Sequence, residues 1–183
     1  MLFNTIEFIV FFVFVLAVVI AIKNNKFQHL FLLGASYFFF YYTSNYLISL
    51  LIFSTLLDYF VGDQIWKTKI LSRKKIFLAL SIVGNLSLLG FFKYTDFAIA
   101  EFNELFRAVG INEVPLLEIV LPVGISFYTF QSMSYTIDIY RGNLTPSKSL
   151  REFALFVAFF PQLVAGPILR ASNFLPQLRE KFS

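Results

Sequence analysis

Residues 121–141 read LPVGISFYTFQSMSYTIDIYR, an apolar stretch with chain breakers at its start and polar side chains along its length. Pro122 and Gly124 interrupt an apolar run over 116–139, and polar positions then recur at helical spacing. The positions of this stripe are Ser126, Phe130 or Gln131, Ser134 and Asp138. Such a stripe faces a wet cavity, or it mediates close packing between membrane helices. The spacing alone leaves both interpretations open.

The composition of the whole chain is that of a membrane protein. Of the 183 residues, 58% are hydrophobic, 20% aromatic and 14% charged, whereas soluble domains have about 25% charged residues. The net charge of +4 does not indicate nucleic acid, because the aromatic side chains lie inside apolar runs and not on a basic face. The absence of cysteine excludes disulfides and thiolate zinc sites, and a single histidine excludes a His–His metal pair. We expect no bound metal or cofactor.

The apolar runs predict an all-α, polytopic membrane helical bundle of about five to six hydrophobic segments, some of them short, broken or re-entrant. The predicted segments are 5–22, 30–42, 46–61, 76–92, 116–139 and 153–169. The first is an uncleaved span, because Glu7 precedes its continuous apolar run over 8–22 and no small-x-small cleavage site follows. The second is short for a full crossing. The fourth is predicted to continue as an amphipathic helix through Phe106.

The sixth segment contains three chain breakers, Pro161, Gly166 and Pro167. A helix in contact with lipid cannot easily leave backbone groups unpaired, so these breakers predict a kinked or re-entrant segment packed against protein or water. The alternative is a helix that ends near Phe160 and is followed by an ordinary loop.

Basic residues predict the orientation in the membrane. They gather after the first, third and fifth segments, and the intervening loop over 101–118 is mostly acidic. The expected location is a bacterial inner membrane. Since Lys and Arg favour cytoplasmic loops, the N-terminus is expected on the side away from the cytoplasm. A re-entrant sixth segment would return the basic tail to the cytoplasmic side.

Ionisable residues inside apolar runs are candidates for inward-facing or paired positions. Lys93 and Asp96 are three residues apart and are expected to form a structural pair. Asp58 either faces inward or is solvated near the cytoplasmic interface. His29 follows two lysines in a polar loop and is expected to be solvated.

Two stretches carry a resemblance to a known family. Residues 121–141, together with 159–170, which read FFPQLVAGPILR, closely resemble the membrane-bound O-acyltransferase family, in particular its alginate O-acetylation branch. Residues 57–59 and 85–94 resemble the same branch, so the likeness spans nearly the whole chain.

The resemblance implies a helical bundle with a central tunnel, in which an acyl group, acetyl by the closest likeness, passes from the cytoplasmic side to hydroxyls of an exported polysaccharide such as alginate. The activated acyl donor is then a substrate, and a histidine acts as general base. In the family this histidine lies in the later half of a longer chain, and His29 does not match it. Residues 1–183 are therefore expected to be the N-terminal part of a single transmembrane domain, inactive alone and without a catalytic residue of its own.

The expected partners are the lipid bilayer, the missing C-terminal half, an acyl carrier and polysaccharide-modifying proteins outside the cytoplasm. Substrate or tunnel contacts are predicted for Gln131, Asp138, Arg141, Gln162 and Arg170. Either arginine would hold an anionic carrier or anchor the chain at the membrane interface. The alternatives are a small transporter or channel subunit, with Asp58, Lys93, Asp96 and Asp138 along its route, and an inert membrane remnant.

Overall fold

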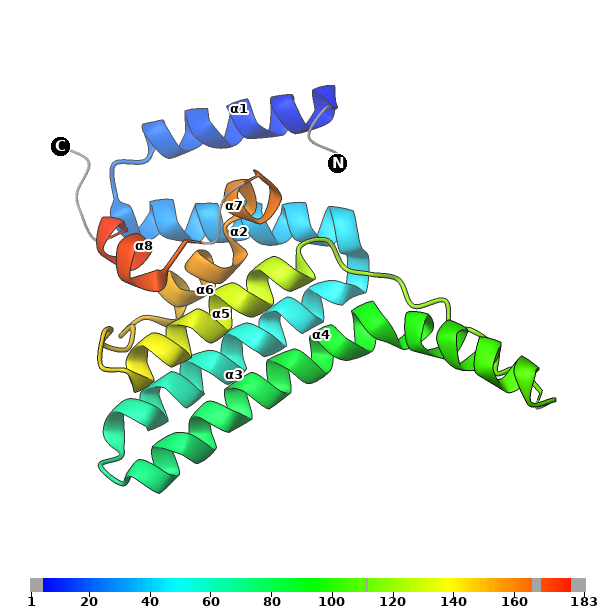
Figure 1. The fold of residues 1–183 in the computed structure, drawn as a ribbon. Coiled ribbons are helices and arrows are strands. Elements are labelled where there is room, and N and C mark those ends of the chain that lie inside the picture. The colour runs from blue at the N-terminus through cyan, green and yellow to red at the C-terminus, as the bar shows by residue number, and fades with distance from the viewer. Residues whose placement is uncertain (1–4, 111, 166–168, 179–183) are drawn as a thin grey trace.

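The computed structural model describes residues 5–110, 112–165 and 169–178. Within these ranges the chain is all-α and contains no strand, which confirms the predicted fold class (Figure 1). The elements are α1 (Ile6–Ala21), α2 (Asn25–Ser44), the 3-10 turn η1 (Asn45–Leu47), α3 (Ile48–Lys67), α4 (Leu71–Ala108), α5 (Ile125–Tyr140), α6 (Leu150–Ala158), α7 (Phe160–Ala165) and α8 (Ala171–Gln177).

The centre of the bundle consists of α3, α4 and α5, which lie side by side, with α6 packed on α2 and α3 (Figure 1). α1 packs on α2 at the edge of the bundle away from α4 (Figure 1). The chain reverses between α2 and α3 at Asn45, which has a φ of +50°. Within the described ranges, two helical stretches are long and apolar enough to cross a membrane, Asn25–Lys67, which includes this reversal, and Leu71–Ala108.

The first two helices begin at side-chain caps. Thr5 accepts a hydrogen bond from the backbone N–H of Phe8, and α1 confirms the predicted first segment. Asn24 accepts one from Lys26 N at 2.9 Å, so α2 begins at Asn25. The second helix is therefore 20 residues long. It is longer than the apolar run over 30–42 because this cap draws polar residues into the helix, and a partial crossing by this segment stays a prediction.

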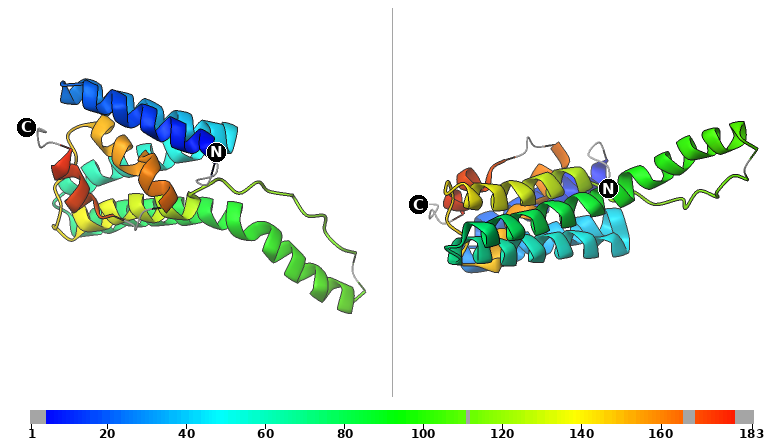
Figure 2. Two further views of the ribbon diagram at one scale, coloured as in Figure 1. Left: turned by 90° about the horizontal axis from the view of Figure 1, so that it is seen from above. Right: turned by 60° about the horizontal axis from the view of Figure 1, so that its bottom comes forward.

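The long helix α4 confirms the predicted continuation of the fourth segment. Its last part projects from the bundle, and the extended chain that follows runs back beside it (Figure 2). The expected Lys93–Asp96 pair does not form. Asp96 instead accepts hydrogen bonds from the backbone N–H groups of Leu117 (2.9 Å) and Ile119 (2.7 Å), which fasten this returning chain to α4. Lys93 lies over the ring of Tyr94, 5.5 Å from its centroid.

The breakers in the fifth segment mark the start of a helix. Gly124 has a φ of +75°, a conformation that favours glycine, and α5 begins at the next residue. Residues 116–123 are not helical. The helical part of this segment is therefore shorter than the apolar run suggested.

The sixth segment is broken, as predicted. α6 ends at Ala158, Phe159 leaves the helical conformation, and α7 starts at Phe160 with Pro161 in its first turn. The alternative interpretation placed the end of the helix near Phe160 correctly, but a second short helix and not an ordinary loop follows it. Gly166 and Pro167 lie outside the described residues, and re-entry of this segment stays a prediction.

Candidate functional site

A buried carboxylate lies at the centre of the bundle. Asp58 on α3 is fully buried, and its side chain accepts hydrogen bonds from three neutral donors on the two neighbouring helices. Ser81 Oγ donates to Oδ1 at 2.5 Å, Asn85 Nδ2 donates to Oδ2 at 2.8 Å, and Ser132 Oγ donates to Oδ2. The interfacial alternative for Asp58 is therefore wrong, and the inward-facing one is confirmed.

A second layer of hydrogen bonds completes this polar cluster. Ser54 Oγ donates to Asn85 Oδ1 at 2.5 Å, and Asn85 Nδ2 also donates to the Ser81 carbonyl at 2.9 Å. Thr136 Oγ1 lies 2.9 Å from Ser81 Oγ. Because burying a carboxylate without partners is costly, these bonds offset its desolvation and fix α3, α4 and α5 in one register.

The sequence interpretation missed the helix partners of Asp58. The available signal was the recurrence of short polar side chains four residues apart, Ser81 with Asn85 on α4 and Ser132 with Thr136 on α5. These pairs place two polar groups on one helix face. Ser132 and Thr136 are not part of the polar stripe predicted for this helix, and both side chains bond within the cluster.

Two predicted site residues come together where the sixth segment breaks. Gln131 on α5 donates through Nε2 to the Phe156 carbonyl at 2.6 Å and lies 3.5 Å from Oε1 of Gln162 on α7. The last carbonyls of a helix lack partners within that helix, so Gln131 satisfies one that the break after α6 leaves free. Both glutamine side chains are buried. The contact places two amides beside a helix break inside the bundle.

The other predicted site residues are not brought together. Asp138 is buried near the end of α5, where its backbone carbonyl accepts a hydrogen bond from Asn143 N at 2.9 Å. Arg141 and Arg170 are exposed. Of the five predicted residues, only Gln131 and Gln162 are in contact. The two arginines are at the surface, where they are available to bind an anion or to anchor the chain at the membrane interface.

His29 is not solvated, as the sequence interpretation expected. It lies in the second turn of α2, only 6% of it is exposed, and its Nδ1 atom is buried without a hydrogen-bond partner. The expectation was wrong because the Asn24 cap turns the presumed loop into helix and brings the imidazole against neighbouring helices. Among the described residues no group of three or more His, Cys, Asp or Glu side chains is placed to hold a metal.

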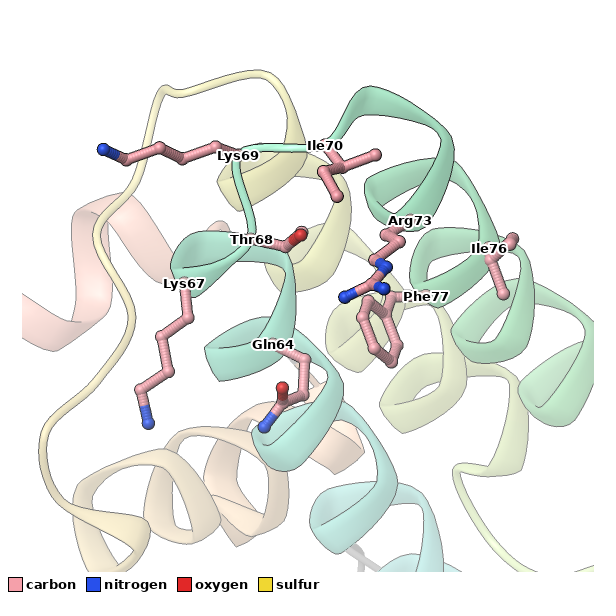
Figure 3. Close-up of a pocket in the computed structure, with 8 residues that line it drawn as sticks. All are labelled: Gln64, Lys67, Thr68, Lys69, Ile70, Arg73, Ile76 and Phe77. Carbon is pink, nitrogen blue, oxygen red and sulfur yellow. The ribbon is translucent and has the colours of Figure 1, made fainter.

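A basic groove lies at the turn between α3 and α4 (Figure 3). It has a volume of about 650 Å³, and Figure 3 shows the Arg73 side chain in the gap between the helices beside Phe77, whereas Lys67 and Lys69 point away. Lys67 pairs with Asp63 at 2.6 Å. The groove coincides with the predicted basic loop after the third segment.

Comparison with known proteins identifies relatives over nearly the whole chain. The chain is 36% identical, over 99% of its length, to the Pseudomonas aeruginosa protein named "Probable alginate O-acetylase AlgI". It is also 36% identical, over 87% of its length, to the peptidoglycan O-acetyltransferase of Helicobacter pylori. The matches cover 35% and 34% of these relatives, so the chain spans about a third of their length. No family model and no solved structure matches the chain.

Proposed function

We propose that this chain, which belongs to the membrane-bound O-acyltransferase family, is part of an enzyme that transfers an acetyl group to hydroxyls of an exported polysaccharide. In this proposal residues 1–183 form one portion of a single transmembrane domain in the bacterial inner membrane, with the N-terminus outside the cytoplasm. The general base lies outside this portion, and a cytoplasmic acyl carrier supplies the donor.

The observation that carries the proposal is the similarity over 99% of the chain to a relative named for acetyl transfer. The relatives are named for two different acceptors, alginate and peptidoglycan. Both polymers are carbohydrates that present hydroxyl groups, so O-acylation of a sugar hydroxyl is the chemistry they share. The acceptor proposed here is accordingly a polysaccharide, with alginate as the first one to test.

We assign different roles to the Asp58 cluster and to the glutamine pair. The Asp58 cluster holds α3, α4 and α5 in register, and its polar groups are already engaged with one another. The amides of Gln131 and Gln162 lie at the break between α6 and α7, where irregular backbone is tolerated if it borders protein or water. We assign these amides to the wall of the substrate path. Asp138 is assigned to the same wall nearer the end of α5.

Arg141 and Arg170 are assigned to the mouth of that path. Both are exposed, and a guanidinium group binds a planar or phosphate anion through two parallel hydrogen bonds. An anionic acyl carrier or donor is the ligand that fits this chemistry.

The rival function, a transporter or channel subunit, finds less support. Asp58 is enclosed by its own hydrogen bonds, and Asp96 is occupied by backbone N–H groups on the projecting part of α4. A permeation route needs polar groups that exchange partners with a passing ion. The two aspartates serve packing instead.

A chimaeric enzyme tests the proposal. The matched segment of the Pseudomonas aeruginosa relative is replaced by this chain, and the acetyl-ester content of the exported alginate is measured in a strain that lacks the native gene. We expect acetyl esters above the empty-vector background, and fewer of them in the Gln131→Ala and Gln162→Ala variants. Ile20→Ala, an exposed change on α1, serves as the matched control.

The same chimaera is also made with the Helicobacter pylori relative and assayed for peptidoglycan acetylation. Membrane-inserted chimaeras that acetylate neither polymer would contradict the proposal. Ion flux through liposomes that contain this chain, abolished by Asp138→Asn, would favour the transporter instead.

A further inference from the structure

The basic groove at the turn between α3 and α4 takes no part in the proposed acetyl transfer. Its volume of about 650 Å³ is within the range of about 300–1,000 Å³ that is typical of small-molecule sites. Its lining residues come from the end of α3, the turn and the start of α4, and they include two lysines and one arginine (Figure 3). We call it the α3–α4 groove.

The turn carries more positive charge than the described part of the chain neutralises. Five cationic residues lie within nine positions, and these are Lys67, Lys69, Arg73, Lys74 and Lys75. Lys67 pairs with Asp63, whereas the other four have no carboxylate within salt-bridge distance among the described residues. An anion is therefore the ligand whose charge complements this turn.

Arg73 is the cation that lies inside the α3–α4 groove. Figure 3 shows its guanidinium group in the gap between the two helices, beside the ring of Phe77. Arg73 is exposed, so a ligand can reach it. Thr68 also lines the groove and contributes a hydroxyl donor. A guanidinium group donates two parallel hydrogen bonds to a phosphate, so a phosphate is the anion that fits this arrangement.

The α3–α4 groove lies where two membrane-spanning stretches end. α3 has 20 residues, which correspond to about 30 Å of helix and match the hydrocarbon thickness of a bilayer. The stretch that contains α3 ends at Lys67, and the next one starts at Leu71. The groove between these two ends is therefore at the level of the lipid headgroups, where phosphate groups surround the protein.

The side chains around the groove distinguish a phospholipid from other anions. Trp66, Ile70 and Ile76 are each more than half exposed at the same turn. Tryptophan is favoured at the boundary between headgroups and hydrocarbon. A phospholipid offers a phosphate to Arg73 and an acyl chain to these apolar side chains, whereas an acidic protein surface or a free phosphate ion offers only the charge.

We propose that the α3–α4 groove binds the headgroup of an anionic phospholipid, with the phosphate at Arg73. The lysines of the turn that have no carboxylate partner add attraction over a longer range. Basic pockets between spanning helices bind such headgroups in membrane proteins generally. The inference goes beyond the proposed acetyl transfer and is independent of it, because the groove contains neither Gln131 nor Gln162.

Lipid titration followed by native mass spectrometry tests the proposal. The complete protein, delipidated in a neutral detergent, is titrated with phosphatidylglycerol and with phosphatidylcholine of the same acyl chains. We expect phosphatidylglycerol to bind about tenfold more tightly, because its phosphate charge is not balanced by a cation in the headgroup.

Two variants locate this preference. Arg73→Gln should remove most of it, since it takes the cation out of the groove. Lys75→Gln is the matched control, because it removes the same charge from an exposed position that does not line the groove, and it should lower the preference by about threefold or less. An equal loss in both variants would assign the preference to the diffuse charge of the turn and overturn the site. Equal affinity of the unmodified protein for the two lipids would overturn it as well.

Chemical modification of Arg73 shows what covers the groove. Phenylglyoxal modifies accessible arginine side chains, and the modified peptide is identified by mass spectrometry. We expect Arg73 to react in the delipidated protein and to be protected by phosphatidylglycerol but not by the same concentration of inorganic phosphate. No reaction in the delipidated protein would show that another protein segment covers the groove, and equal protection by inorganic phosphate would show a site for a free anion. Either result overturns the proposal, and neither depends on acetyl transfer.

Discussion

Two regions of the bundle are held together by different forces. In the α3–α4–α5 region, Asp58 and the serine, asparagine and threonine side chains around it form directional hydrogen bonds between helices. In the α1–α2–α7 region, the contacts are between aromatic rings, with Phe160 packed among Phe8, Phe11 and Phe39. The first region is polar inside and closely packed, and the second is apolar and borders an open cavity.

The difference has a physical consequence for specificity. Hydrogen bonds to a buried carboxylate fix both distance and angle, so they allow one register of the three helices. Ring contacts are favourable over a range of geometries, with centroids about 4.5–7 Å apart. We therefore expect the central region to respond sharply to small changes and the α1 region to respond locally.

The largest effect is expected from Asp58→Ala. It leaves three donors, on Ser81, Asn85 and Ser132, without their acceptor inside the bundle. At about 1–3 kcal/mol for each unsatisfied group, the free energy of unfolding should fall by about 4 kcal/mol or more. Unfolding of the purified protein in mixed micelles, followed by circular dichroism, measures it.

Asp58→Asn is the matched control, since it keeps the shape and one acceptor oxygen. It should lose distinctly less stability than Asp58→Ala. Equal stability of the unmodified protein and the alanine variant would show that the polar cluster does not hold the three helices together.

Phe160→Ala should have the next largest effect, confined to the other region. The ring is buried, with its centroid 5.2 Å from that of Phe11 and 5.6 Å from that of Phe39, and its loss enlarges the space beside α1. The expected cost is about 3 kcal/mol, seen chiefly as faster hydrogen exchange in α1 and α7. Phe160→Leu should recover most of it. Slower or unchanged exchange in α1 would contradict this reading.

Gly62→Ala probes how closely the central helices approach one another. A Cβ atom at Gly62 would lie 2.7 Å from Tyr135 Cε1 and 2.9 Å from Ile139 Cδ1, both on buried side chains. Tyr135 is held in place, because its hydroxyl accepts a hydrogen bond from Ser147 N at 3.0 Å. Overpacking should lower the free energy of unfolding by about 2 kcal/mol. A stability equal to that of the unmodified protein would mean that α3 and α5 separate easily.

Gly34→Ala is the smallest change and should have the opposite sign. A Cβ atom at this helical position in α2 meets nothing within 4 Å. Alanine restricts the unfolded chain and favours helix, so stability should rise by about 0.5–1 kcal/mol. The same unfolding titration compares it with Gly62→Ala, and a loss of stability at Gly34 would indicate a neighbour that the described residues do not include.

Much of the bundle was predictable from apolar runs and breakers. The run over 76–92 and its amphipathic continuation gave α4, and the two breakers near Gly124 marked an interruption of the fifth segment, although the sequence did not show that only the part after them is helical. The extent of α2 was not predicted, because the Asn24 cap depends on one hydrogen bond that composition does not reveal. Of the candidate site, Gln131 and Gln162 were named from the sequence, but their contact across 31 positions was not foreseeable from helical spacing.

The sequence by itself determined that the chain is an all-helical membrane protein and where its helices are interrupted, because hydrophobicity, proline and glycine act locally along the chain. Only the tertiary structure decided which polar groups meet. In the sequence Asp58 is a single charge in an apolar run, and its hydrogen-bond donors on α4 and α5 are known only from the structure. His29 was interpreted as a loop residue, and only the structure shows it beside α1 and α8. Both outcomes depend on how helices distant in sequence pack, and local spacing carries no information about that packing.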